Sequence, residues 1–259
     1  LKIRLNNKVK TMDKAQYIWM DGKLVAWDDA KIHILTHTLH YGNGVFEGTR
    51  AYMTDEGLAI FKLREHTKRL LNSAKITRIK PNFTLEALES AHVELLKAND
   101  FKSNAYIRPL IYLGYGIMGL NHVKAPVNTA IAAWQWGSYL GDEGLENGIR
   151  VKISSFTRNP VTSTMGKAKA AANYLNSQLA KYEALEAGYE EALLLDADGF
   201  IAEGSGECFF IVRDGVLISP PNDTSLESIT QGMVLELARD AGIPIQRRRI
   251  TRDEVYIAD

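Results

Sequence analysis

The sequence predicts a two-domain protein of the α/β (α+β) class with many antiparallel strands. Its 259 residues are enough for two medium-sized hydrophobic cores. Asp-Gly pairs lie between apolar stretches at Asp21, Asp198 and Asp214, and this dipeptide is the strongest short-range signal for a tight hairpin. Segments with helical periodicity separate the strand segments. Glycines at 137, 141 and 144 make this stretch the best candidate for an interdomain connection.

The smaller N-terminal domain is expected at residues 1–134, with the basic residues 1–11 as a possible extension. Residues 17–20 are expected to pair with 23–27, and 45–52 with 58–63 across a turn. Apolar residues at helical spacing predict helices at 64–76 and 85–98, with Thr84 as a cap and Asn99-Asp100 as a stop. Aromatic and branched residues predict strands at 105–113 and 128–136.

The linker is expected at 135–145 and the larger C-terminal domain at 146–259. Within that domain we predict a strand at 149–156, a helix at 171–187 ended by Gly188, and strand pairs around Asp198 and Asp214. A helix at 230–241 ends before Gly242, a strand follows at 243–250, and a last helix begins near Arg252. We expect the final part of this domain to lie beyond Asp259.

The composition points to small-molecule chemistry. Lys plus Arg and Asp plus Glu are balanced at 31 each, so no overall field attracts nucleic acid or an anionic membrane. The one cysteine, Cys208, excludes an intramolecular disulfide and is typical of a cytoplasmic protein. No apolar run has the length needed to cross a bilayer.

Lys169 is the candidate nucleophile. It lies in Ala-Lys-Ala-Ala-Ala-Asn-Tyr at 168–174, among methyl side chains and five residues before Tyr174. A lysine that forms an imine needs a partly neutral amine, and an apolar setting or a nearby cation such as Lys167 favours one. The segment suits a planar aldehyde cofactor. By itself it also suits an ordinary helix start, because alanine and lysine are strong helix formers.

A phosphate site is predicted at Ser-Ile-Thr-Gln, residues 228–231, where hydroxyls precede a helix. The first amides of a helix lack intrahelical partners and its dipole favours an anion. An ordinary cap by Thr230 is the alternative, and it is compatible with anion binding. Gly166-Lys167 does not form a P-loop, because Ala168 occupies the hydroxyl position.

Other candidates carry charge. Glu203 ends an apparent strand at a Glu-Gly-Ser-Gly-Glu turn, where it can meet a buried cation. Tyr106 and Arg108 alternate with Ile107, so they share one strand face and together suit a carboxylate. Arg69 is one of several basic residues on an amphipathic helix. For each of these the ordinary alternative is a solvated side chain.

A histidine cluster raises the alternative of a metal-dependent hydrolase. His33, His37 and His40 lie at i, i+4 and i+7, which would align three imidazoles on one helix face. No acidic residue lies within the cluster and the His-Glu-x-x-His motif is missing. We therefore predict no metal, and expect these histidines to support the glycine loop at 41–44 through hydrogen bonds.

Taken in order, the motifs resemble the branched-chain-amino-acid aminotransferases, which are fold-type IV pyridoxal-phosphate enzymes. They are His-Tyr-Gly at 40–42, Val-Phe-Glu-Gly at 45–48, Arg-Glu-His-Thr-Lys-Arg-Leu at 64–70, Tyr-Ile-Arg-Pro at 106–109, Trp-Gly-Ser-Tyr-Leu-Gly at 136–141, the lysine segment at 168–175, Glu-Gly-Ser-Gly-Glu at 203–207 and Ile-Thr at 229–230. The resemblance covers nearly all of 17–259, and it implies a small N-terminal domain and a larger cofactor-binding domain that enclose the cofactor.

The resemblance implies pyridoxal 5′-phosphate as the cofactor. The residues expected to hold it are Lys169 through the internal aldimine, Arg69, Ile229 and Thr230 on the phosphate, Tyr174 on the ring oxygen and Glu203 on the pyridine nitrogen. An ionised Glu203 keeps that nitrogen protonated, so that the ring accepts electrons from the substrate. Once displaced by an amino acid, Lys169 moves a proton between the substrate α-carbon and cofactor C4′.

The substrates that the resemblance implies are branched-chain L-amino acids (leucine, isoleucine and valine) and 2-oxo acids, with 2-oxoglutarate as the amino acceptor. The family's apolar and aromatic pocket maps to Tyr41, Phe46, Tyr106, Trp136 and Tyr139, with Gly48 leaving room and Arg108 binding the carboxylate of the dicarboxylic partner. A homodimer, or a higher assembly of dimers, is expected, with the neighbouring subunit touching the pocket.

Two departures from the family pattern bear on activity. Cys208 stands where family members commonly carry asparagine. The family's glycine-threonine segment, which completes the phosphate and carboxylate sites, does not occur before Asp259. Alternatives within the fold are a D-amino-acid aminotransferase and an aminodeoxychorismate lyase. A cofactor-binding protein without turnover is a further alternative.

Overall fold

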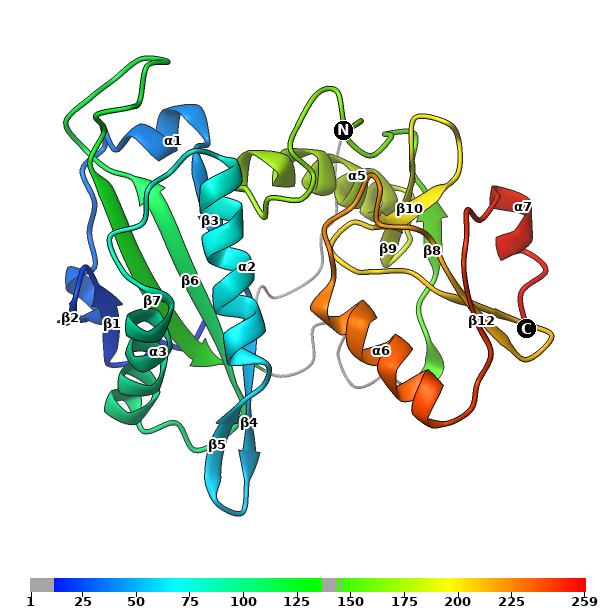
Figure 1. Cartoon of the computed structure of the whole chain (residues 1–259), viewed down its shortest axis with the longest axis horizontal. Coiled ribbons are helices and arrows are strands. Elements are labelled where there is room, and N and C mark those ends of the chain that lie inside the picture. The colour runs from blue at the N-terminus through cyan, green and yellow to red at the C-terminus, as the bar shows by residue number, and fades with distance from the viewer. Residues whose placement is uncertain (1–11, 137–143, 145) are drawn as a thin grey trace. The chain divides into compact units, whose positions relative to one another are not determined.

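The computed structural model describes residues 12–136, 144 and 146–259 (Figure 1). They fall into two compact units. The first contains the described residues before Glu146 together with Ala168–Ala172, and the second contains Glu146–Lys167 and Asn173–Asp259. One difference from the predicted contiguous division is that 168–172 joins the first unit. Of the predicted extension and linker, residues 1–11, 137–143 and 145 lie outside the described part.

The first unit is built on a seven-stranded sheet with the order β2-β1-β7-β6-β4-β5, and β3 also pairs with β6. All of these pairings are antiparallel. The strands are β1 (Tyr17–Met20), β2 (Lys23–Ala26), β3 (Gly44–Phe46), β4 (Thr49–Thr54), β5 (Gly57–Ile60), β6 (Ala105–Leu113) and β7 (Val127–Gln135). The expected hairpin of 17–20 with 23–27 is confirmed, with Tyr17 opposite Ala26.

Helices α2 (Leu63–Ile76) and α3 (Leu85–Asn99) pack on this sheet, and the short η1 (Trp27–Asp29) and α1 (His37–Tyr41) precede β3 (Figure 1). Thr84 caps α3 as predicted, because its side chain accepts from the Ala87 amide at 3.2 Å. The central strand β6 buries Ile107 and Ile111 completely in the core on one face. Its alternate residues therefore face the other side, which sets up the site described below.

The second unit contains two smaller sheets, ordered β10-β9-β8 and β11-β12-β13. Its strands are β8 (Val151–Ile153), β9 (Glu191–Leu195), β10 (Ile201–Gly204), β11 (Ile211–Arg213), β12 (Val216–Ser219) and β13 (Ile245–Arg247). Its helices are η2 (Ala171–Asn173), which begins in the first unit, α5 (Tyr174–Glu186), α6 (Ile229–Asp240) and α7 (Arg252–Val255). Ile250, which is fully buried, packs with Leu193, Ile201, Ile211 and Ile218 to form the main core cluster.

The three predicted hairpin turns all form. At Asp21-Gly22 and Asp214-Gly215 both residues have positive φ, with values of 47° and 96° and of 52° and 74°. This is the type I′ pattern that Asp-Gly favours. At the third turn only Gly199 has positive φ, so that hairpin uses a different turn.

Two strand predictions need correction. The single strand expected at 45–52 is divided at Glu47 and Gly48: β3 pairs with β6, whereas β4 pairs with both β5 and β6. The division falls where the Glu47 side chain bonds to α2. The strands expected at 149–156 and 243–250 are only three residues long, because each pairs in parallel with a single neighbour over that length.

Two helix starts also differ from prediction. Residues 171–173 form the 3-10 turn η2, so α5 begins at Tyr174, and Gly188 follows its end with a φ of 81° as expected. α6 begins at Ile229, and its cap is Ser228, whose side chain accepts from the Gln231 amide at 3.0 Å. Thr230 therefore lies inside the first turn. Among the described residues, none of the helices is long and apolar enough to cross a membrane.

Candidate active site

Lys169 lies in a short non-helical stretch that belongs to the first unit. Ala168 and Ala170 are 2% and 8% exposed in a core cluster, and Ala170 forms an isolated bridge to β3. The backbone of Lys169 is held at both ends: its amide donates to Ser73 Oγ at 3.0 Å, and its carbonyl accepts from the Phe46 amide at 3.1 Å. The helix-start alternative holds only for the second half of this segment, where η2 begins at Ala171 and α5 at Tyr174. Lys169 itself precedes the helix, between two buried alanines.

The Lys169 side chain meets an aromatic ring. Lys169 is only partly buried, whereas Ala168 and Ala170 on either side of it are buried. Its Nζ lies 5.4 Å from the centroid of the Phe46 ring. The guanidinium carbon of Arg108 lies 4.7 Å from the same centroid. Phe46 therefore brings together the lysine and the arginine that the sequence singled out.

A buried carboxylate, Glu47, lies next to Phe46 in the chain. It is fully buried, accepts from Arg69 Nε at 2.5 Å and from Arg69 Nη2 at 2.8 Å, and lies 2.8 Å from His66 Nδ1. His66 and Arg69 are three residues apart on α2 and so share a face. Burial by itself raises the pKa of Glu47, but the bonds to Arg69 and His66 and the charges of Arg69 and Lys169 lower it to about 2. The carboxylate is therefore ionised.

Tyr106 and Arg108 share one face of β6, as predicted. Arg108 Nη2 donates to the Tyr106 hydroxyl at 3.1 Å, and the Tyr106 ring packs against both Trp134 and Trp136, at centroid distances of 5.0 and 4.8 Å. A Cβ on Gly48 would lie 2.0 Å from the Tyr106 hydroxyl. Glycine at position 48 therefore makes room for the Tyr106 phenol.

Arg108 also lines a cavity of about 280 Å³ on the same face of the sheet. The other lining residues are mainly apolar and come from β1, β6, β7 and the segment around α1: Ile18, Met20, Ala30, Ile32, Thr36, Thr38, Leu39, Leu110, Tyr112, Ala130 and Ala132. A cavity with apolar walls and one guanidinium suits an apolar ligand that carries a carboxylate.

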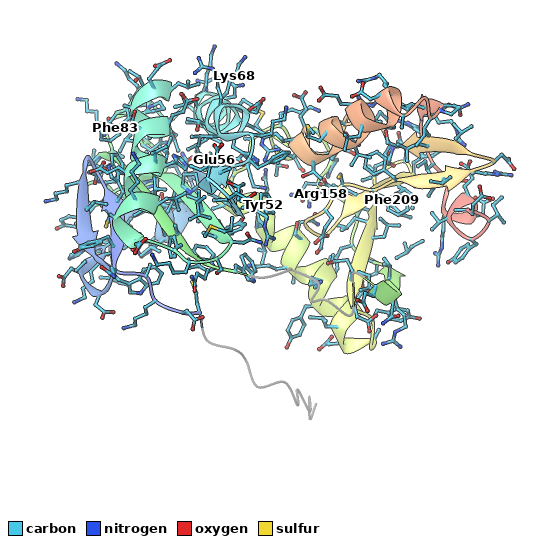
Figure 2. The ribbon with its side chains drawn as sticks, turned by 90° about the horizontal axis from the view of Figure 1, so that it is seen from below. Tyr52, Glu56, Lys68, Phe83, Arg158 and Phe209 are labelled. Carbon is cyan, nitrogen blue, oxygen red and sulfur yellow. The ribbon has the colours of Figure 1, made fainter. Side chains whose placement is uncertain are left out.

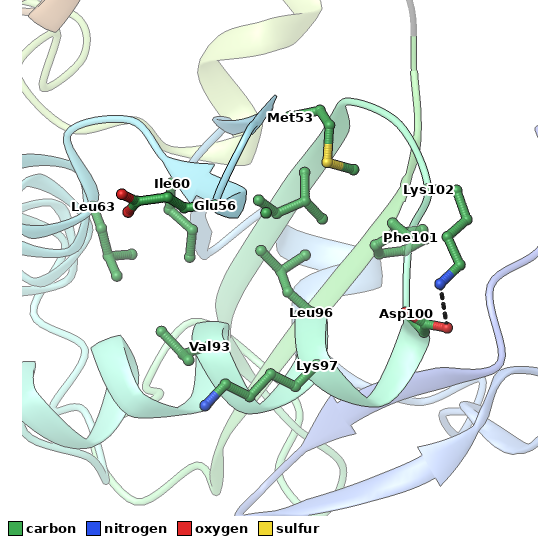
Figure 3. A pocket seen from close by; sticks show the side chains of 12 residues that line it. Met53, Glu56, Ile60, Leu63, Val93, Leu96, Lys97, Asp100, Phe101 and Lys102 are labelled. Carbon is green, nitrogen blue, oxygen red and sulfur yellow. Dashed lines mark hydrogen bonds and ion pairs between the residues drawn. The ribbon is translucent and has the colours of Figure 1, made fainter.

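A pocket of about 770 Å³ lies elsewhere in the first unit, between the β4-β5 hairpin and α3 (Figure 3). Apolar residues such as Leu63 and Val93 line it, together with Lys102 and Asp100, which form an ion pair at 2.7 Å. None of the predicted site residues lines it.

Two other predicted substrate residues are tyrosines. Tyr41 ends α1, and its hydroxyl accepts from the Gly119 amide at 3.1 Å. Its side chain is 41% exposed. Tyr139 lies outside the described residues.

In the second unit, Glu203 lies on β10 next to an irregularity in the pairing with β9. Its carboxylate pairs at 2.7 Å with Arg158, which Figure 2 labels in the second unit, and both side chains are only 13–14% exposed. Arg158 also donates to Asn176 Oδ1 at 3.3 Å and to Ser177 Oγ at 2.9 Å, both on α5. Glu203 thus does meet a buried cation, as the sequence predicted, and that cation is an arginine of the protein.

The remaining predicted cofactor residues begin two helices of the second unit. Tyr174 is the first residue of α5, and Ile229 and Thr230 are the first two residues of α6. α6 has 12 residues, and Ser228 satisfies one of its first amides. The others are the kind of donors that bind an anion. Burial raises the pKa of the nearby Cys208 thiol, and its hydrogen bond to Ser228 partly offsets this.

The structure does not bring the three histidines of the cluster together as one group of ligands. Only His37 and His40 lie in α1, and the described residues contain no group of three His, Cys, Asp or Glu side chains arranged to hold a metal. The ring Nε2 atoms of His37 and His40 lie 2.9 Å from the carbonyls of Gly119 and Ile34. The expectation that they support the 41–44 loop is wrong. Thr38, which donates to the Asn43 carbonyl at 2.8 Å, does so instead.

Lys167 belongs to the second unit and has its polar contacts there. Its Nζ donates to the carbonyls of Asn222 and Ser225 and lies 3.7 Å from Glu227, all in the second unit. Lys167 therefore anchors a loop of that unit.

Sequence reasoning missed the partners of the predicted ligands. Glu47 and His66 lie within two of the family motifs, and Arg158 lies in none of them. The sequence does hold a signal for Glu47. It follows Phe46 inside an apolar strand segment, and a carboxylate that is buried there needs a cation as its partner. For Arg158, 45 residues before Glu203 in the chain, no local pattern pointed to the pairing.

Comparison with known proteins gives close matches over nearly the whole chain. Residues 44–259 match the model of the amino-transferase class IV family. The chain is 48% identical over 247 residues to the branched-chain-amino-acid aminotransferase of Pseudomonas aeruginosa, covering 95% of this chain and 80% of that protein.

Solved structures agree. The branched-chain aminotransferase of Thermoproteus uzoniensis with norvaline is 44% identical, with a TM-score of 0.91 over 95% of this chain and 82% of that one. The branched-chain amino acid aminotransferase of Thermobaculum terrenum in its PLP-form is matched at 35% identity with a TM-score of 0.86, over 94% and 80% of the two chains.

Proposed function

Since the chain belongs to the class IV aminotransferases and, within them, to the branched-chain-amino-acid aminotransferases, we propose that it transfers the amino group of leucine, isoleucine or valine to 2-oxoglutarate with pyridoxal 5′-phosphate. The expected fold-type IV fold is confirmed by the TM-score of 0.91. The observation that carries the proposal is this likeness combined with the fixed backbone of Lys169, whose amine lies beside Phe46.

The side chains of the two units fit the chemical groups of the cofactor. Arg69 has five N–H donors, of which two serve Glu47. Its Nη1–Nη2 edge has the geometry that binds a phosphate in a bidentate manner. The first amides of α6 at Ile229 and Thr230 suit the same group. Tyr174 binds the ring oxygen, and the carboxylate of Glu203 binds the ring nitrogen.

The chemistry divides between cofactor and protein. Pyridoxal phosphate, when bound, supplies the electron sink that makes the substrate α-proton removable. Lys169 is the residue to which the cofactor attaches. Its amine then takes the proton from the substrate α-carbon and returns it at C4′, as a general base followed by a general acid. Glu203, held by Arg158, keeps the ring nitrogen protonated.

Substrate binding uses the face of β6. The rings of Phe46 and Tyr106 and the apolar walls of the 280 Å³ cavity take the branched side chain. Arg108 takes the second carboxylate of the dicarboxylic partner. Gly48, by making room for Tyr106, sets the shape of this surface. Trp136, Tyr41 and Tyr139 complete the substrate surface in this proposal.

The test is reductive trapping. We expect borohydride treatment of the holoenzyme, followed by mass spectrometry, to place a pyridoxyl adduct on Lys169. Lys169→Ala should lose the adduct and reduce kcat by about 10²–10⁴-fold or more, because the proton-transfer group is removed. Lys167→Ala is the matched control and should keep the adduct. An adduct on Lys167 contradicts the assignment.

Donor profiling tests the substrate. Transfer from L-leucine to 2-oxoglutarate supports the proposal. Transfer from D-alanine and not from L-leucine would support the D-amino-acid alternative, and lyase activity without transfer would support the aminodeoxychorismate alternative. Since apolar pockets separate similar side chains weakly, we expect leucine, isoleucine and valine to differ by less than about 200-fold in kcat/KM.

We also propose a cytoplasmic homodimer, in line with the one cysteine of the sequence and with the exposed apolar residues Ile34, Leu39, Leu120 and Val123 of the first unit. Size-exclusion chromatography with light scattering measures the assembly, and a monomeric holoenzyme contradicts the dimer.

A further inference from the structure

We infer that Glu47 is a positioning residue whose buried carboxylate holds the guanidinium of Arg69 in the orientation that phosphate binding requires. The inference rests on the proposed role of Arg69 toward the cofactor. It concerns only the first unit, in which Glu47, His66, Arg69 and Lys169 all lie.

The hydrogen bonds of Glu47 fix the orientation of its carboxylate. Oε1 accepts from Arg69 Nε at 2.5 Å, and Oε2 accepts from Arg69 Nη2 at 2.8 Å and from the Gly48 amide at 3.3 Å. An ionised carboxylate only accepts, so His66 carries a proton on Nδ1 and donates it to Oε2 at 2.8 Å. Both oxygens are thus satisfied without solvent.

The bidentate contact uses the Nε–Nη2 edge of Arg69. Two parallel bonds to a planar carboxylate fix the plane of the guanidinium as well as its position. The Nη1–Nη2 edge then has one defined direction. A flexible arginine would have to be ordered each time a phosphate binds, which weakens binding.

The main chain of Glu47 ties this arrangement to the lysine. The Glu47 amide donates to the Pro109 carbonyl on β6 at 3.0 Å, and the preceding amide, of Phe46, donates to the Lys169 carbonyl at 3.1 Å. Consecutive residues therefore hold the segment of Lys169 and the guanidinium of Arg69. These bonds thereby fix, within the first unit, the separation between Arg69, which is proposed to bind the phosphate, and Lys169, to which the cofactor is proposed to attach.

Stability alone does not explain a buried ion pair at this place. A buried pair is often no more stabilising than well-packed apolar residues of similar volume, because both charges lose their hydration. Placing a carboxylate there has a clear advantage only if the orientation of Arg69 matters. This argument, with the geometry, assigns Glu47 to positioning and leaves direct contact with the cofactor to Arg69.

The experiment compares two ligands that differ only in the phosphate. Apoenzyme is titrated with pyridoxal 5′-phosphate and with pyridoxal, and absorbance gives the dissociation constants. Outer-shell partners of metal ligands contribute about 10- to 100-fold to affinity, and we expect Glu47→Gln to weaken pyridoxal phosphate binding by about this factor. The glutamine keeps the shape but presents one oxygen and an amide donor to the guanidinium. Pyridoxal binding should not change.

Arg69→Lys provides the reference. It should weaken pyridoxal phosphate binding and leave pyridoxal binding unchanged. Adding Glu47→Gln to Arg69→Lys should have little further effect, since the guanidinium that Glu47 orients is no longer present. If Glu47→Gln does not fold, as judged by circular dichroism, Glu47→Asp replaces it. Aspartate keeps the charge but withdraws it from Arg69, and the same selective loss is expected.

The outcomes separate the inference from the proposed function. Equal weakening of both ligands by Glu47→Gln means a general structural role and overturns the inference, as does no weakening when Arg69→Lys weakens pyridoxal phosphate. If Arg69→Lys leaves that affinity unchanged, the phosphate role of Arg69 is wrong and the inference is wrong with it. If the unaltered protein binds neither ligand, the proposed function itself is wrong.

Discussion

Each unit contains a buried pair of an arginine and a glutamate. The arginine is the proposed cofactor ligand in one pair, and the glutamate is the proposed ligand in the other. In the first unit Arg69 is the proposed ligand and Glu47 supports it. In the second unit Glu203 is the proposed ligand and Arg158 supports it. The comparison teaches that the residue of an ion pair that contacts a ligand cannot be told from the pair alone. The charge of the ligand's own group decides it.

The two supports are built differently. Glu47 is fully buried and is held by α2 through His66 and Arg69. Arg158 is held by the side chains of Asn176 and Ser177 on α5, and both it and Glu203 retain some exposure. Loss of the arginine should therefore be more damaging in the first unit, where the Glu47 carboxylate is fully buried, than in the second, where Glu203 keeps some exposure to water.

The largest expected effect is on stability. Arg69→Ala should lower the free energy of unfolding by about 3–5 kcal/mol, because it leaves the Glu47 carboxylate fully buried without the arginine. Arg158→Ala should lower it by only about 1–3 kcal/mol, since Glu203 can gain water. Urea unfolding followed by circular dichroism measures both. A larger loss for Arg158→Ala would reverse the comparison.

The pH dependence of stability should carry the signature of Glu47. Its pKa is about 2 in the folded state and near 4.5 in the unfolded chain, so its contribution is complete above about pH 4.5 and is lost as the pH falls toward 2. At about 1.4 kcal/mol per pH unit between the two pKa values, this contribution is roughly 3 kcal/mol. The stability difference between the unaltered protein and Glu47→Gln should shrink over this range. A difference that stays constant from pH 5 to pH 2.5 contradicts the assignment.

The smallest expected effect compares two helix caps, one in each unit. Thr84 caps α3 and Ser228 caps α6, each by accepting from the amide three residues later. Thr84→Ala and Ser228→Ala should each cost about 1 kcal/mol of stability. Only Ser228→Ala should also weaken pyridoxal phosphate binding, because only α6 has proposed phosphate contacts at its start. An equal effect of both variants on binding would remove α6 from the site.

Local pattern was enough for most elements. The aromatic and branched residues at 105–113 predicted β6 to the residue, and the apolar spacing at 64–76 predicted α2 to within one residue. Tyr106 and Arg108 were placed on one face correctly, because the side-chain period of a strand is fixed by its backbone. Local pattern did not find the division of β3 from β4, since that follows from the bonds of Glu47 to another element.

The sequence by itself determined the hairpins, the main helices, the family and the residues proposed to touch the cofactor, since turn chemistry, periodicity and short motifs are local properties. Only the tertiary structure decided which residues support them. Arg69 meets Glu47 across 22 positions, and the Lys169 amide meets Ser73 across 96. The physical reason is burial: a charge removed from water must find its partner wherever the fold provides one, and this choice leaves no trace in the nearby sequence.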